Sequence, residues 1–250
     1  HYVDGRKNGI WTWWFDSGVK QSEGHYVDDE QDGLWSYFSK DGSVAEEITF
    51  SSGKRDGRST VWLTPEEKQE EKFYRNGKLD GPSTFWENGY RSTMTTYKSD
   101  LPEGPWVIWF SNSDQIKEQG FHQKGIREGL TTYYYEDGTM QREGFFKDGL
   151  PDGMWTYWNK KGEKDFDFDF GSGLQHISLE DLVERESTFY KLGEDTPFTG
   201  IITQENPEAD YLFLGRTKSG KKDGQWVKWF PSGKDVPEII LVEVPDPEPV

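Results

Sequence analysis

The chain has 250 residues, a formal net charge of −17 and a hydrophobic fraction of only 32%, which taken alone would suggest disorder. Aromatic residues nevertheless make up 16% of the chain, so rings supply the apolar surface, as expected for a β protein. The acidic balance argues against nucleic acid and anionic membranes as partners. The sequence has no run of 18 apolar residues, so direct membrane insertion is not expected.

A short motif recurs along the chain with a period of about 24 residues, as in GKRDGRSTVW at 53–62 and GKLDGPSTFW at 77–86. We index each repeat on the second glycine of the motif. We predict that these are turn glycines, because glycine readily adopts the positive φ of tight hairpins. The index glycines are Gly9, Gly33, Gly57, Gly81, Gly104, Gly129, Gly153, Gly200 and Gly224.

The segments between the turns are short, alternating and rich in rings, for example IWTWWF at 10–15 and MWTYW at 154–158. Such segments are typical of strands, and each is followed by a second strand, such as KQSEGHYV at 20–27. One repeat is therefore a β-hairpin. The predicted fold class is all-β: an elongated, single-layer antiparallel β-sheet of tandem 24-residue hairpins.

A ring stands five residues after the index glycine in every well-formed repeat. Strand alternation places this row on one face, while rings two and four residues after the index face the other way. A single-layer sheet must build its core from such ring ladders, so we predict that the row is structural rather than a binding site. The row is Trp14, Phe38, Trp62, Trp86, Trp109, Tyr134, Trp158 and Trp229.

The pattern Gly-x-x-x-Gly-x-Trp-x-x-Trp/Tyr, as in GLPDGMWTYW at 149–158 and GKKDGQWVKW at 220–229, resembles the MORN repeat in its bacterial variant form. An Asn/Asp/Ser-Gly turn and a Glu-x-x-Phe/Tyr return strand complete the resemblance. It implies an extended β scaffold that binds proteins and has no catalytic motif. Some bacterial members carry the label antitoxin. Eukaryotic relatives are linked to phospholipids, which the charge of this chain argues against.

Four parts are expected in chain order. Residues 1–170 hold seven tandem MORN-like repeats, and 171–188 form an irregular or short helical break with Ser178 as cap and Asp181 at the third position. Residues 189–235 hold one degenerate and one regular repeat, and 236–250 an edge strand with a Pro-rich, acidic tail. A bent continuation of the sheet through the break is favoured over a second short sheet.

The first residues, HYVDGRKNG, read as the second half of a repeat, so we expect a truncated chain or a longer precursor. Periplasmic or extracellular localisation is favoured over the cytoplasm.

Catalytic, cofactor and metal sites are not expected. The chain has no cysteine, its four histidines do not have the spacing of a metal motif, and no nucleophile elbow or phosphate loop is present. Asp165, Asp167 and Asp169 share one face of a strand and are candidate ligands for calcium. The favoured alternative is a strand whose wet face carries these aspartates and whose dry face buries Phe166, Phe168 and Phe170.

These observations predict a non-catalytic repeat scaffold for protein–protein interaction, with a structural subunit of a larger cell-surface or periplasmic assembly as one form of that role. The alternative is a secreted glycan-binding module that uses solvent-facing Trp and Tyr rows.

Overall fold

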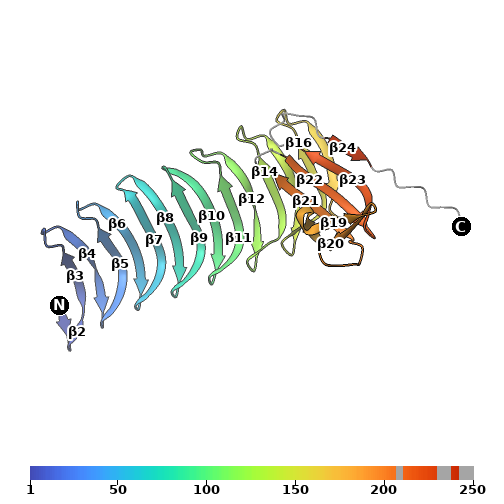
Figure 1. The fold of residues 1–250 in the computed structure, drawn as a ribbon. Helices are drawn as coiled ribbons and strands as arrows, with labels where there is room; N and C mark the ends of the chain where they lie inside the picture. Colours follow the sequence, from blue (N-terminus) through green and yellow to red (C-terminus); the bar gives the residue numbers. More distant parts are fainter. Residues whose placement is uncertain (207–210, 230–237, 242–250) are drawn as a thin grey trace. The chain divides into compact units, whose positions relative to one another are not determined.

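The computed structural model describes residues 1–206, 211–229 and 238–241, and the chain divides into a first unit, His1–Glu128, and a second unit, Gly129–Val250. The described residues form β-strands and one 3-10 turn (Figure 1). No helix in these ranges has the length and apolar character needed to cross a membrane. The structure therefore confirms the predicted all-β fold of tandem antiparallel hairpins.

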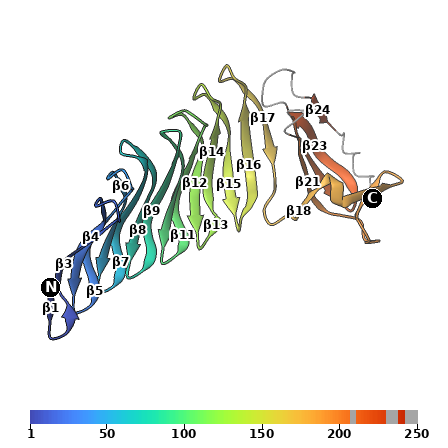
Figure 2. The same ribbon diagram turned by 60° about the vertical axis from the view of Figure 1, so that its left-hand side comes forward.

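In the first unit, the strands follow one another in chain order and each pairs antiparallel with the next, in a single layer (Figure 2). The short strands β1 and β2 pair separately, and β13 extends the edge beside β12. The strands are β1 (Tyr2–Val3), β2 (Arg6–Lys7), β3 (Gly9–Trp14), β4 (Lys20–Val27), β5 (Glu30–Phe38), β6 (Val44–Ser51), β7 (Lys54–Thr64), β8 (Glu67–Arg75), β9 (Lys78–Glu87), β10 (Tyr90–Lys98), β11 (Leu101–Trp109), β12 (Ile116–Gln123) and β13 (Ile126–Arg127).

The turns that precede the index glycines, except Gly200, are two-residue turns in which both central residues have positive φ. At Asn76-Gly77 the φ angles are 51° and 83°, and Arg75 pairs with Lys78 across the turn. Positive φ at both central positions is the signature of the type I′ turn, whose twist matches that of the strands. The turn glycine is thus the first glycine of the motif, four residues before the index glycine.

The index glycines lie within or at the start of strands rather than in these turns. All of them except Gly200 have positive φ, with values from 64° at Gly153 to 132° at Gly81. Register shifts in the strand pairing accompany several of them, as between Ile48 and Phe50 opposite Gly57. An extra residue on one strand is a β-bulge, which explains why the motif needs two glycines. Gly200 begins β21 without positive φ.

The described part of the second unit contains two larger sheets and one two-stranded hairpin. The first is a meander of β14 (Gly129–Tyr134), β15 (Met140–Lys147), β16 (Leu150–Trp158) and β17 (Lys164–Asp169). The second has the order β18-β21-β22-β23-β24, with β18 parallel to β21 and the other neighbours antiparallel. Its strands are β18 (His176–Ser178), β21 (Gly200–Asn206), β22 (Tyr211–Lys218), β23 (Lys221–Trp229) and β24 (Glu238–Leu241).

The connection from β18 to β21 within the second sheet holds the 3-10 turn Leu179–Asp181, where the Ser178 hydroxyl accepts a hydrogen bond from the Glu180 N–H at 3.4 Å. A separate hairpin, β19 (Leu182–Arg185) and β20 (Thr188–Lys191), follows it. The favoured bent continuation of the sheet through 171–188 is wrong, because the meander ends at β17 and a second sheet begins. Of the predicted tail, only β24 lies within the described residues.

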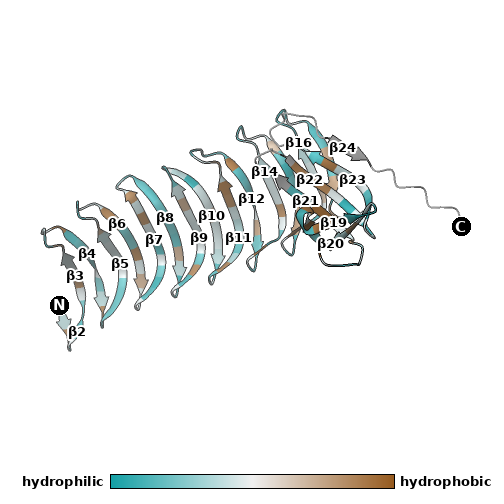
Figure 3. Ribbon diagram, viewed as in Figure 1, coloured by the Kyte–Doolittle hydropathy of each residue, from teal (hydrophilic) through white to brown (hydrophobic). Residues whose placement is uncertain are grey.

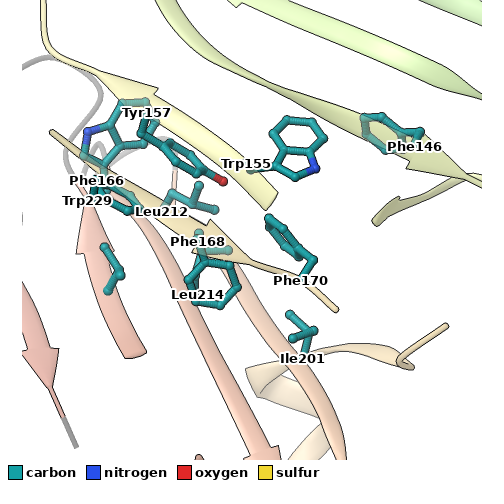
Figure 4. Close-up of a cluster of buried hydrophobic side chains, with 11 residues drawn as sticks. Phe146, Trp155, Tyr157, Phe166, Phe168, Phe170, Ile201, Leu212, Leu214 and Trp229 are labelled. Carbon is teal, nitrogen blue, oxygen red and sulfur yellow. The ribbon is translucent and has the colours of Figure 1, made fainter. Parts of the chain in front are cut away.

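The aromatic face of β17 explains why a second sheet packs against the first one in this unit. Phe166, Phe168 and Phe170 are buried together with Trp155 and Tyr157 of β16. Aliphatic side chains of the other sheet cover them, among them Leu214 of β22 (Figure 4). Three phenylalanines on one face would expose a large apolar area to water in a single layer, so a second layer is favourable here. The expected dry face of β17 is therefore observed.

Candidate interaction surface

Rings two and four residues after the index glycine, together with rings of the return strands, form a ladder on one face of the first two repeats, from Tyr2 to Phe50. Trp13 lies 5.6 Å from Trp35, and Trp35 lies 5.0 Å from Tyr26 and 6.4 Å from Phe50, measured between ring centroids. Most of these contacts are edge-to-face or tilted, which are favourable geometries for aromatic pairs. In these two repeats the rings of this face pack against one another.

A glycine in the return strand lies beneath a tryptophan of the next strand in three places. The indole Nε1 then donates to the backbone carbonyl of the residue after the glycine, at 3.1 Å from Trp35 to His25 and 3.0 Å from Trp226 to Arg216. The three pairs are Gly24 with Trp35, Gly144 with Trp155 and Gly215 with Trp226. We call this arrangement the glycine–indole lock. Sequence reasoning missed it, although the eleven-residue spacing from glycine to tryptophan was a visible signal.

The opposite face carries the residues one, three and five positions after the index glycine. We call it the acidic–aromatic face. In the first unit its middle row pairs a hydroxyl with a carboxylate across neighbouring strands, as Thr12 with Glu23 at 2.9 Å. In the second unit the sheet of β14–β17 has an equivalent face, where Thr132 pairs with Glu143 at 3.1 Å. Thr156 pairs with Asp167 in the same way at 2.8 Å. These pairs give the acidic–aromatic face of each unit a row of carboxylates.

Lysines connect the carboxylates to the predicted ring row. The ammonium of Lys20 lies 2.9 Å from Glu23 and 5.6 Å from the centroid of Phe38 in the next repeat. Lys68 repeats this arrangement, 2.7 Å from Glu71 and 5.5 Å from Trp86. We call these sets Lys–carboxylate–ring triads. Their signal in the sequence, a lysine three residues before an acidic residue at the start of the return strand, was also missed.

The ring row itself is unevenly covered. Trp14 is 59% exposed, whereas Trp109 and Trp229 are buried. Arg91 covers the ring of Trp109, at 4.8 Å from the centroid. The remaining members are half-buried, namely Phe38, Trp62, Trp86, Tyr134 and Trp158.

Apolar side chains one residue after the index glycine remain exposed on the acidic–aromatic face. Ile10 is 70% exposed and Leu34 53% exposed in the first unit. In the second unit Leu130 and Met154 are exposed at the same repeat position, and Leu130 pairs directly with exposed Phe145. Repetition of exposed apolar groups at one position is the property expected of an interaction surface.

An apolar cleft of about 290 Å³ lies in the second unit, lined by rings that include Tyr133, Trp155 and Phe170. Arg142 lies 4.2 Å above the Tyr133 ring, and His176 stacks on Phe170 at 5.5 Å. Burial lowers the pKa of His176, so the imidazole is held neutral.

The three aspartates of β17 have separate partners. Asp167 pairs with Thr156 and Lys164, whose hydrogen bond lowers the pKa of this carboxyl. Asp169 accepts from the Gly171 N–H at 2.8 Å, and burial raises the pKa of Asp165. Within the described ranges no three side chains of metal-ligating type come together.

Comparison with protein families identifies three repeats in the chain. A family model described as "MORN repeat variant" matches residues 7–28, 31–52 and 127–148. The predicted resemblance is thereby confirmed, and these three segments are MORN repeats of the variant type. MORN repeats are generally non-catalytic modules for protein or membrane interactions. A search of curated proteins found no match.

Proposed function

We propose that this chain, with its MORN repeats of the variant type, is a non-catalytic scaffold that binds a protein partner through the acidic–aromatic face. The observation that carries the proposal is the exposed apolar position after the index glycine, which Ile10 and Leu34 fill in the first unit. Leu130 and Met154 fill the same repeat position in the second unit, considered by itself. Folding does not require these side chains to face water at the same place in successive repeats. Apolar groups beside charged ones are typical of protein interfaces.

Charge supports a protein rather than an anionic membrane as partner. The chain carries a net charge of −17, and the acidic line of Glu23, Glu47 and Glu71 follows the exposed face of the first unit. Anionic lipid headgroups would be repelled by this surface. A partner with basic side chains would be attracted.

The alternative role in glycan binding has less support. Sugar rings stack on open faces of aromatic side chains, but Lys20, Lys68 and Arg91 lie over Phe38, Trp86 and Trp109. Trp14 is the most exposed ring of the row, at 59%. Tryptophan fluorescence titrated with polysaccharides should remain unchanged, and a saturable shift would favour the glycan role.

A surface variant tests the proposal. Ile10→Glu with Leu34→Glu places two charges in the apolar row while leaving the buried ladder intact. A partner isolated on the wild-type chain, then purified, should bind the wild type in calorimetry and lose at least tenfold in affinity for the variant. Leu192→Glu is the matched control, because Leu192 is 60% exposed and lies after β20, outside the face. Equal affinity of all three proteins would contradict the proposed surface.

A further inference from the structure

One repeat of the first unit lacks the lysine of the Lys–carboxylate–ring triad. Val44 stands 24 residues from both Lys20 and Lys68, at the equivalent position. The other two members are retained, because Glu47 is equivalent to Glu23 and Glu71, and Trp62 to Phe38 and Trp86. This repeat thus keeps the carboxylate and the ring but has no ammonium group of its own at that position.

A hollow lies where the lysine head would be. It has a volume of about 230 Å³ and is lined by Val44, Glu47, Trp62 and Pro65. Across the ranges that the structure describes, Glu47 has no ion pair and no cation lies over Trp62. Val44 and Trp62 are half-buried, so the hollow has an apolar floor beside a carboxylate.

We propose that this hollow binds a lysine side chain supplied by a protein partner. The same fold shows twice how an ammonium group occupies the place, within 3 Å of a carboxylate and about 5.5 Å from a ring centroid. Glu47 would accept the charge-assisted hydrogen bond, Trp62 the cation–π contact, and the lysine stem would cover Val44. The acidic charge of the chain favours such a donor.

The inference deepens the proposed function, since the lysine must come from a partner on the same face, but it can be tested without that partner. The probe is a short peptide with one lysine, titrated against 15N-labelled protein while the indole N–H resonance of Trp62 is followed. The expected result is a weak, saturable shift of this resonance. The same peptide with norleucine in place of lysine should give none.

Two variants sharpen the test. Val44→Lys fills the hollow from within the chain and should abolish the shift, whereas Glu47→Gln should weaken binding about tenfold, as expected for loss of one charge-assisted hydrogen bond. Circular dichroism establishes that each variant is folded. If Val44→Lys does not fold, the effect of Glu47→Gln on the Trp62 shift alone tests the lysine site. Lys68→Val is a gain-of-function control, because it should open a second hollow at Glu71 and Trp86.

The outcomes separate the inference from the proposed function. Absence of a Trp62 shift in the wild type, or an unchanged shift in Val44→Lys or Glu47→Gln, overturns the lysine site even if a partner binds the face. A lysine-dependent shift that the variants remove supports the site, even if the exposed apolar row proves not to bind a partner.

Discussion

The indole ring of Trp35 lies so close over Gly24 that a β-carbon built on this glycine would fall 2.1 Å from the ring. The Trp35 Nε1 also donates to the His25 carbonyl at 3.1 Å, so packing and hydrogen bonding fix the same contact. Both residues are buried. The pair joins the return strand of one repeat to the first strand of the next.

Gly24→Ala should therefore destabilise the first unit by about 2–3 kcal/mol, because the methyl group forces the indole out of place. Urea unfolding followed by circular dichroism measures the change. In a Trp35→Ala background the same substitution should cost far less, since the ring is absent. Additive effects in this double-mutant cycle would show that Gly24 does not act through Trp35.

The Lys–carboxylate–ring triad should contribute little to stability. Lys68 and Glu71 have side chains that are 39% and 21% exposed, so the solvent screens their attraction. A double-mutant cycle of Lys68→Met and Glu71→Gln should give a coupling of about 0.5 kcal/mol that decreases at 1 M salt. Lys98→Met, at an exposed position on β10, is the control. A coupling above about 2 kcal/mol would contradict this assignment.

Stability of the second unit should fall in mild acid because of His176. Burial lowers its folded-state pKa, while the unfolded imidazole titrates near pH 6.5. The unfolded state consequently binds more protons as the pH falls below about 6.5, and the free energy of unfolding decreases by at most about 1.4 kcal/mol per pH unit. Denaturation of the wild type and His176→Phe at pH 7.5 and 5.5 checks this. An identical acid response in the variant would exclude His176 as its source.

Two phenylalanines in one sheet of the second unit, on β15 and β17, should respond very differently to truncation. Phe168 is 2% exposed between the two sheets, and Phe145 is 55% exposed on the acidic–aromatic face. Phe168→Ala should cost about 3–5 kcal/mol by leaving a cavity, whereas Phe145→Ala should cost less than about 1 kcal/mol. Similar losses for both would argue against two packed layers. Loss of partner binding in Phe145→Ala alone would support the proposed face.

The hairpin architecture was predictable because its signals are local and repeated. A two-residue turn such as Asn76-Gly77 identifies a hairpin by itself. The period of about 24 residues then locates the remaining hairpins of the tandem array. The same signals could not separate the turn glycine from the bulge glycine. Both adopt positive φ, and only the strand pairing shows that Gly81 lies within β9.

The second sheet was harder to predict because its evidence lies in long-range packing. Aliphatic residues such as Ile201 and Leu214 form a core with the rings of the first sheet. The interruption of the period between Gly153 and Gly200 indicates a break in the repeat, but it does not show that a second layer packs there. The hollow beside Trp62 was hidden for a different reason. The hollow exists because one repeat has Val44 where two others have a lysine. The role of that lysine position is recognised only from the contacts of Lys20 and Lys68 with their rings.

The glycine–indole lock joins two consecutive hairpins, because the glycine lies in the return strand of one and the tryptophan in the first strand of the next. An isolated 24-residue hairpin therefore contains the glycine or the tryptophan of a lock without its partner. The smallest cooperative module is then the return strand of one hairpin with the first strand of its successor. Shortened arrays cut at the type I′ turns would separate Gly24 from Trp35, whereas cuts at the opposite loops would keep both on one piece. Shortened or shuffled arrays of such repeats should therefore be joined at the loops opposite the type I′ turns, so that each glycine stays on the same piece as its tryptophan.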